Sequence, residues 1–241
     1  MTVLDHHRVI AIDGPGAAGK STVALKLAEH LGALLFDTGA LYRAVTLASL
    51  RVGIPGADAG ALATLANAIR IEIRPASVAD GRQIDVLLDG EDVTWAIRSP
   101  EIDARVSEVA AHPQVRDALL PVQREIADGT MAVLVGRDIG TVVIPGAGTK
   151  VYLDASTAER ARRRLIELGE RGIPSTYDSV FRDLERRDAY DSKRDTSPLR
   201  AAPDALVIAT DGLSIEAIVN EIETTVRSRW EAGRAANDRA G

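Results

Sequence analysis

The stretch Gly14-Pro15-Gly16-Ala17-Ala18-Gly19-Lys20-Ser21 has the pattern G-x-x-x-x-G-K-S, and it determines how the rest of the chain is interpreted. The preceding residues 8–13 (R-V-I-A-I-D) are mostly β-branched and apolar, which predicts a buried strand. Residues 20–31 carry apolar side chains at helical spacing, and Gly32 ends this predicted helix. A strand, a glycine-rich turn and a helix in this order predict a loop that holds a phosphate group.

The residue types of this loop suit the phosphates of a nucleotide. Glycines let the backbone curl until several N–H groups point at one anion, and the start of the next helix adds positive charge. Lys20 can reach the β- and γ-phosphates, and the hydroxyl of Ser21 is a ligand for Mg²⁺. The residues expected to contact the nucleotide are Gly14, Pro15, Gly16, Ala17, Ala18, Gly19, Lys20, Ser21 and Thr22.

Composition narrows the class of protein. The chain has 241 residues and no cysteine, which excludes disulfides, thiolate zinc sites and a cysteine nucleophile. Its net charge of −6 argues against a general nucleic-acid binder, and no apolar run reaches the length of a membrane span. We expect a cytoplasmic protein with no membrane or nucleic-acid partner. Arginines nevertheless concentrate between residues 160 and 194, which favours a small anionic ligand.

The remaining pattern alternates between strands and helices, which indicates an open, mostly parallel α/β sheet flanked by helices. Apolar runs predict further strands at residues 34–36, 131–135, 150–153 and 205–209. Further helices are predicted at residues 38–50, 100–127 with a break near Pro113, 155–170, 177–191 and 214–230. Residues 232–241 are expected to fray.

Residues 64–104 have a different sequence pattern, which predicts a small antiparallel sheet inserted into the α/β frame. Residues 69–73 and 83–88 are rich in β-formers, and Asp89-Gly90 is a tight-turn signal before residues 91–94. We therefore divide the chain into a core domain, residues 1–63 and 105–241, and an insertion, residues 64–104.

Three further segments carry polar residues near the predicted ligand edge. Residues 37–43 (D-T-G-A-L-Y-R) and 136–143 (G-R-D-I-G-T-V-V) each follow a predicted strand, and residues 186–199 contain the sequence R-R-D-A-Y-D-S-K-R. Ligands of open parallel sheets bind beyond the carboxyl ends of the strands. The first two segments should therefore lie beside the phosphate loop.

With these segments the chain resembles bacterial cytidylate kinases nearly from end to end. The most specific matches are D-T-G-A-L-Y-R, G-R-D-I-G-T-V-V and the D-S-x-R-x-x-S-P-L sequence that begins at Asp191. The resemblance implies a P-loop fold with a monophosphate-binding insertion and a short helical lid at about residues 160–195. It also implies phosphoryl transfer from ATP to CMP or dCMP with Mg²⁺. Ala17 departs from the family, which usually has glycine there, and this could narrow the backbone angles of the loop.

The resemblance also assigns roles to individual residues. It implies that Ser107, Arg116 and Asp138 read the cytosine edge, and that Arg160 joins the residues around ATP. The implied catalytic residues are Lys20, Arg137, Arg163, Arg164 and Arg187. The implied acceptor-binding residues are Thr38, Tyr42, Arg43, Ser107, Arg116, Arg137, Asp138, Arg187, Asp191 and Arg194.

Physical chemistry supports this type of site independently. Two anionic reactants need dense positive charge to approach each other, and arginine can hold phosphate oxygens in pairs. A carboxylate such as Asp138 can accept the amine hydrogen of cytosine, whereas uracil reverses donor and acceptor at two positions. No general base is required, because an acceptor phosphate dianion is already a nucleophile.

Two alternatives remain at this stage. The same frame could phosphorylate another small molecule, such as UMP, dTMP or shikimate, and residues 107, 116 and 138 would decide between them. The chain could also be a non-catalytic nucleotide-binding scaffold. A guanine-reading N-K-x-D motif, which a nucleotide switch would carry, is absent from the sequence. Nothing in the sequence demands more than a monomer.

Overall fold

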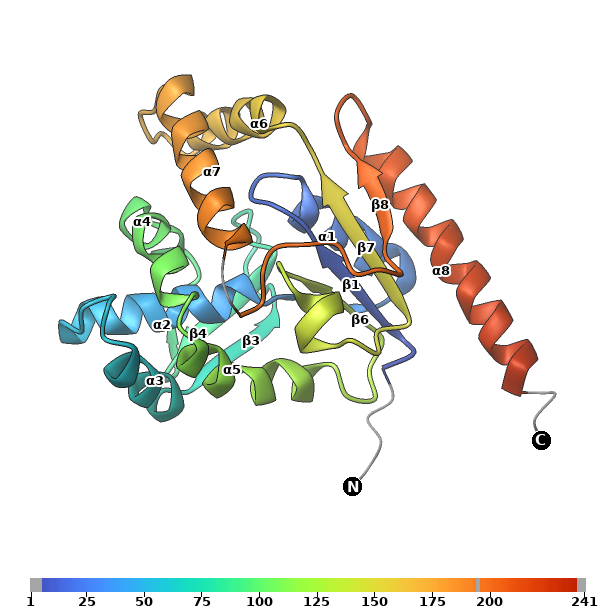
Figure 1. Cartoon of the computed structure of the whole chain (residues 1–241), viewed down its shortest axis with the longest axis horizontal. Coiled ribbons are helices and arrows are strands. Elements are labelled where there is room, and N and C mark those ends of the chain that lie inside the picture. Colours follow the sequence, from blue (N-terminus) through green and yellow to red (C-terminus); the bar gives the residue numbers. More distant parts are fainter. Residues whose placement is uncertain (1–5, 194–195, 238–241) are drawn as a thin grey trace.

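The computed structural model describes residues 6–193 and 196–237 and is built around a five-stranded parallel sheet (Figure 1). The strand order is β2-β6-β1-β7-β8, and every neighbouring pair is parallel. The strands are β1 (Val9–Asp13), β2 (Leu34–Asp37), β6 (Ala132–Val135), β7 (Thr149–Asp154) and β8 (Leu206–Ala209). The predicted parallel sheet and its five strands are confirmed.

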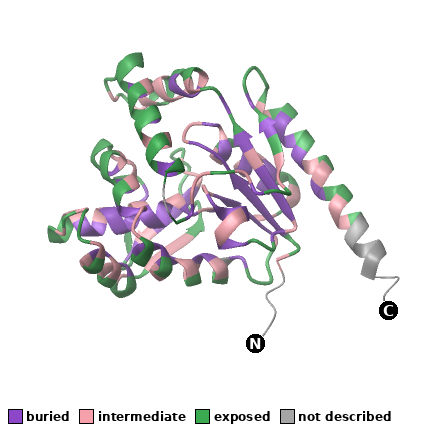
Figure 2. Cartoon of the chain, in the orientation of Figure 1, coloured by how far each residue is buried: buried purple, intermediate pink, exposed green. Residues whose placement is uncertain are grey.

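Helices cover both faces of this sheet, which explains why its central strands are continuously apolar. Ile10 and Ile12 of β1 share a core with α1 (Lys20–Leu31) and α8 (Ile215–Asn237). Their neighbours Val9 and Ala11 point the other way, into a core with α2 (Gly39–Val52) and α5 (Pro113–Ile126). Figure 2 shows the resulting buried sheet between exposed outer helices.

The predicted antiparallel insertion is confirmed as a three-stranded sheet. It consists of β3 (Ile71–Pro75), β4 (Ile84–Leu88) and β5 (Glu91–Asp92). The β4–β5 turn has positive φ at both Asp89 (51°) and Gly90 (87°), as the turn signal predicts. The apolar face of this sheet packs on α2 through Ala40, Ala44 and Ala48.

Two helices near the insertion complete this side of the molecule. The sequence analysis missed α3 (Ala59–Ala68), which Asp58 caps and which crosses the proposed domain boundary at residues 63/64. A short η1 turn (Ala96–Arg98) leads into α4 (Pro100–Val109). The predicted break near Pro113 is confirmed, because α5 begins at this proline, where a missing N–H costs nothing.

The region predicted as a lid forms a helical pair above the sheet (Figure 1). Ser156 caps α6 (Thr157–Glu170), and Thr176 caps α7 (Tyr177–Ser192). The two helices pack through a small core of their own, whose buried members are Ala161, Val180 and Leu184. Ala17 of the phosphate loop packs against this lid core.

The expectation that the chain frays from residue 232 is wrong for residues 232–237. Helix α8 continues to Asn237, which lengthens the predicted helix at residues 214–230. Three of the seven added residues, 231–237, are alanine, the strongest helix former. The rest of the segment predicted to fray, residues 238–241, lies outside the described residues.

Candidate active site

The phosphate loop, Gly14–Ser21, leaves the carboxyl end of β1 and turns into α1 (Figure 1). Gly14 has φ +146°, and a Cβ there would lie 2.1 Å from the carbonyl oxygen of Leu153, so only glycine fits. Ala17 has φ 61°, which costs a residue with a Cβ about 1–2 kcal/mol. Ala17 adopts this left-handed conformation despite the cost, and its methyl group packs against the lid core.

Lys20 is buried at the start of α1 and faces the loop rather than solvent. Its Nζ donates a hydrogen bond to the carbonyl oxygen of Pro15 at 2.6 Å. Burial lowers the pKa of Lys20 well below its usual value, and the nearby Arg137 lowers it further. A bound anion would raise the pKa of Lys20 again, so the site favours a negatively charged ligand.

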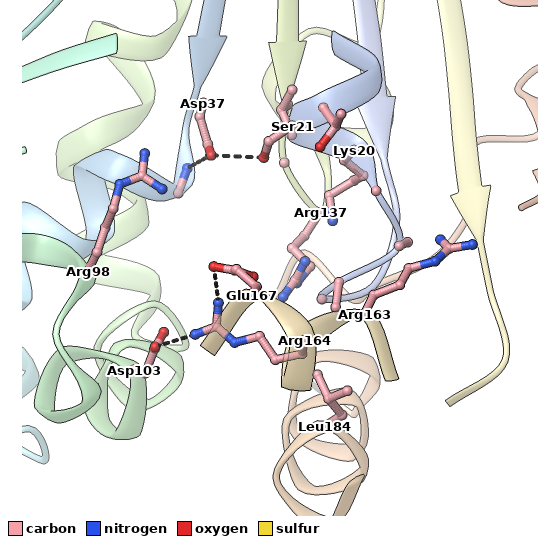
Figure 3. A pocket seen from close by; sticks show the side chains of 18 of the residues that line it. Lys20, Ser21, Asp37, Arg98, Asp103, Arg137, Arg163, Arg164, Glu167 and Leu184 are labelled. Carbon is pink, nitrogen blue, oxygen red and sulfur yellow. Dashed lines mark hydrogen bonds and ion pairs between the residues drawn. The ribbon is translucent and has the colours of Figure 1, made fainter. Parts of the chain in front are cut away.

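Ser21 and Asp37 bring two hard oxygen donors together beside the loop (Figure 3). The Ser21 hydroxyl lies 3.5 Å from Asp37 Oδ2, while Asp37 Oδ1 accepts a 2.9 Å hydrogen bond from the Gly39 N–H. Hydroxyl, carboxylate and water oxygens are the ligands that Mg²⁺ prefers. The pair therefore fits a magnesium ion that keeps several of its waters.

A cavity of about 1200 Å³ extends from the phosphate loop to α4 and the lid. It unites most of the site residues that the sequence analysis names. Those that line it are Gly16, Ala17, Ala18, Gly19, Lys20, Ser21, Thr22, Thr38, Tyr42, Arg43, Ser107, Arg116, Arg137, Asp138, Arg163, Arg164, Arg187 and Asp191. Among the described residues, Gly14, Pro15 and Arg160 are predicted site residues that do not line the cavity.

Arg116 and Asp138 form a buried ion pair at the end of the cavity lined by Tyr42 and Ala110. Arg116 also donates to the carbonyl oxygen of Ala110 at 3.1 Å, and its guanidinium lies 5.3 Å from the centre of the Tyr42 ring. Ser107 lines the same end. These contacts fix a carboxylate and a guanidinium side by side, a pattern that can read a flat heterocycle by its hydrogen bonds.

Arg137 joins the segment after β6 to the phosphate loop. Its Nε donates to Asp191 at 2.6 Å, and its Nη1 donates to the carbonyl oxygen of Gly14 at 3.0 Å. Burial lowers the pKa of Arg137, although Asp188 and Asp37 oppose this shift. The guanidinium is thus held between α7 and the phosphate loop.

Arg160 and Arg163 both lie on α6 but have different surroundings. Arg160 is buried and donates to the carbonyl oxygens of Ala155 (3.0 Å) and Gly16 (3.2 Å). Arg160 therefore holds the backbone of the phosphate loop at Gly16, and its predicted contact with the nucleotide stays a prediction. Arg163 lines the cavity and donates to Thr210 through two nitrogens, at 3.0 and 2.9 Å.

Asp13, at the end of β1, anchors the segment that carries Arg137 and Asp138. Its two carboxylate oxygens accept hydrogen bonds from the N–H groups of Ile139 and Gly140, each at 2.8 Å. These residues begin a short η2 turn (Ile139–Val143) that the sequence analysis missed. Burial raises the pKa of Asp13 to about 6, against the lowering effect of the two hydrogen bonds.

This raised pKa predicts a pH dependence of stability. The native carboxyl binds its proton more tightly than the unfolded one, so the contribution of Asp13 to stability falls as pH rises from about 4 to about 6. We expect the unfolding free energy of the wild type, relative to Asp13→Asn, to fall by about 2–3 kcal/mol across this window. Urea denaturation of both proteins at several pH values measures it, and parallel curves would contradict the prediction.

Several cavity residues were missed by sequence reasoning. Asp37 follows β2 within the quoted D-T-G sequence, so its place at a strand end was an available signal. Arg98 and Asp103 line the cavity from η1 and α4, where no strand end or motif marks them. Arg194, predicted to bind the acceptor, lies outside the described residues.

Residues 6–193 and 196–237 contain no group of three or more histidine, cysteine, aspartate or glutamate side chains arranged to hold a metal ion. No helix in the same ranges is both long and apolar enough to cross a membrane.

Comparison with known proteins agrees with this geometry. A cytidylate kinase from Chloroflexus aggregans is 50% identical over 207 residues, which cover 86% of this chain and 88% of that protein. A cytidylate kinase from Herpetosiphon aurantiacus is 48% identical over 213 residues, 88% of this chain and 91% of the relative. An uncharacterized protein from Eubacterium ventriosum, of known crystal structure, shares the fold at 13% identity, with a TM-score of 0.50 over 91% of this chain and 98% of that one.

The sequence pattern of one family extends over almost the whole chain. It matches residues 10–228, from β1 into α8, and thus includes the phosphate loop, the insertion and the lid. The chain belongs to the cytidylate kinase family.

Proposed function

We propose that this chain transfers the γ-phosphate of ATP to CMP or dCMP and releases ADP with CDP or dCDP. One observation carries the proposal: the phosphate loop, the buried Arg116–Asp138 pair and several further arginines line a single cavity. Membership of the cytidylate kinase family supports the same reaction, with ATP as the donor.

At the donor end, the backbone of the phosphate loop and the start of α1 hold the phosphates of ATP. Lys20 exchanges its bond to the Pro15 carbonyl oxygen for the β- and γ-phosphates, and Arg163 approaches them from the lid. Ser21 and Asp37 would hold Mg²⁺, whose charge, when the ion is bound, neutralises the transferred phosphate oxygens.

At the acceptor end, the base of CMP lies against the Arg116–Asp138 pair. Asp138 has lone pairs left after pairing with Arg116 and accepts the exocyclic amine of cytosine, while Arg116 and Ser107 donate toward N3 and O2. Thr38 and Tyr42 line the same end, and Asp191 faces the ribose. The acceptor phosphate is bound by Arg43, Arg137 and Arg187, which line the cavity.

Transfer itself needs positioning rather than acid–base chemistry. An oxygen of the acceptor phosphate attacks the γ-phosphorus, and the bond from this phosphorus to the β–γ bridging oxygen breaks, so ADP leaves with both electrons. Lys20, Arg137 and the lid arginines neutralise the charge of the transition state. The cavity walls keep the two phosphates in line.

The proposal is tested by measuring ADP release with CMP, dCMP, UMP, dTMP, AMP and shikimate side by side. We expect CMP and dCMP to exceed the others in kcat/KM by about a hundredfold, because uracil leaves buried groups of the pocket unpaired. Excess EDTA should abolish the release.

The other outcomes separate the alternatives. Preference for UMP, dTMP or shikimate would replace the acceptor but keep the reaction. ATP binding without ADP release for any acceptor would indicate a scaffold and overturn the proposal.

A further inference from the structure

Asp103 of α4 binds three arginines that come from three different helices. Arg43 of α2 and Arg164 of α6 each donate to its carboxylate at 2.6 Å, from opposite oxygens. The Nη1 of Arg187, on α7, lies 3.8 Å away. Figure 3 shows Arg164 reaching from the lid to Asp103 within the cavity. One carboxylate thus connects the acceptor side of the cavity with both lid helices.

Arg164 also pairs with Glu167 at 2.6 Å, and the three arginines still outnumber the two carboxylates of this cluster. Burial alone would raise the pKa of Asp103, but Arg43 and Arg164 outweigh it and hold the pKa below its usual range. Burial, with Arg137 and Arg43 nearby, lowers the pKa of Arg187 to about 10. In the described structure the buried Nε of Arg187 has no hydrogen-bond partner. The arginines around Asp103 could therefore bind a further anion.

We propose that Asp103 is a built-in competitor of the acceptor phosphate, holding Arg43 and Arg164 until that phosphate displaces it. The inference rests on the proposed function, which assigns Arg43 and Arg187 to the acceptor phosphate. A carboxylate and a phosphate are bound by guanidinium groups through the same paired hydrogen bonds, so one can replace the other. A phosphate dianion brings more charge and more oxygens than the carboxylate, which favours the exchange.

This arrangement makes Asp103 a specificity-determining residue. Any anion that enters must bind the arginines more strongly than Asp103 does, so weakly charged anions are rejected. Its side chain is only 19% exposed, and solvent therefore screens these interactions less than those of a surface ion pair. The competition between Asp103 and the acceptor phosphate should consequently change the Kd of the acceptor.

The test compares CMP with cytidine, which lacks the phosphate, by isothermal titration calorimetry. Asp103→Asn should lower the Kd for CMP by about tenfold and leave the Kd for cytidine unchanged, because only the phosphate competes with Asp103. Inorganic phosphate should also bind more tightly. A residue that merely orders the arginines would give the opposite sign, since its loss would weaken CMP binding.

Further variants separate charge from structure. Asp103→Glu keeps the charge and should retain the wild-type ratio of the two Kd values, and Asp103→Ser should behave as Asp103→Asn does. Glu101→Gln is the matched control, because Glu101 lies on α4 and its ion pair within the described ranges is with the exposed Arg105, at 3.7 Å.

The results also distinguish this inference from the proposed function. A ratio of cytidine Kd to CMP Kd that does not rise in either neutral variant overturns the competitor role. If the wild type neither prefers CMP to cytidine nor releases ADP with CMP, the proposed function itself fails.

Discussion

The Lys20→Ala variant should lose phosphoryl transfer by about 10²- to 10³-fold in kcat and keep its fold. Lys20 is the side chain of the phosphate loop that can follow charge onto the β- and γ-phosphates as the bond breaks. Its present partner is the Pro15 carbonyl oxygen, 2.6 Å away, so the variant gives up one hydrogen bond within the loop. Single-turnover measurements of ADP formation with CMP give the rate of the chemical step.

The stability of the Lys20→Ala variant should not fall together with its activity. Burial and Arg137 lower the pKa of Lys20 well below its usual value, which means that the folded protein disfavours this charge. We therefore expect the variant to unfold at the same urea concentration as the wild type or a higher one.

Lys26→Ala is the matched control, since Lys26 lies on the same helix, is exposed and pairs with Glu216. A folded Lys20→Ala enzyme with wild-type kcat would refute the assignment of the phosphate loop.

The second large effect is expected at the base-reading end of the cavity. Asp138→Asn should reduce kcat/KM for CMP by about a hundredfold and nearly abolish the preference for CMP over UMP. An amide can offer either its oxygen or its amine hydrogens, so it no longer distinguishes the cytosine amine from the uracil carbonyl. Each unmet hydrogen bond costs about 1–3 kcal/mol.

Asp138→Asn also leaves the Arg116 guanidinium without its charged partner. An unpaired buried guanidinium destabilises a fold by about 3–5 kcal/mol, so the variant loses stability as well as base recognition. The ratio of CMP to UMP activity is independent of the fraction folded and is the quantity to measure. A double variant, Arg116→Gln with Asp138→Asn, removes both charges and controls for stability. Equal losses with CMP, with UMP and in ATP hydrolysis without an acceptor would contradict the base-reading role of Asp138.

The parts of the site that sequence reasoning found are those written in contiguous residues. The phosphate loop is a local turn flanked by a strand and a helix, and residues 37–43 and 136–143 leave neighbouring parallel strands. Their meeting at one edge follows from topology alone. The cavity lined by Lys20, Arg137 and Asp138 confirms this expectation.

The parts that were missed depend on pairings between distant segments. Asp103 is one acidic residue on a polar helix, and only the fold brings Arg43 and Arg164 to it. Arg160 belongs to a predicted arginine cluster, but its burial behind Gly16 depends on how α6 packs on the loop. Spacing along a helix predicts which face a side chain occupies, but it does not predict which other segment packs against that face.

The separate core of the lid has a consequence for thermal adaptation. Ala161, Val180 and Leu184 bind α6 to α7, while the two large apolar layers on the sheet determine how the body melts. Among the described residues, Ala17 is the body residue that packs on the lid core, so a movement of α6 and α7 as a pair would leave both large layers closed. Substitutions within this small core are therefore expected to change turnover while the melting temperature of the body stays the same.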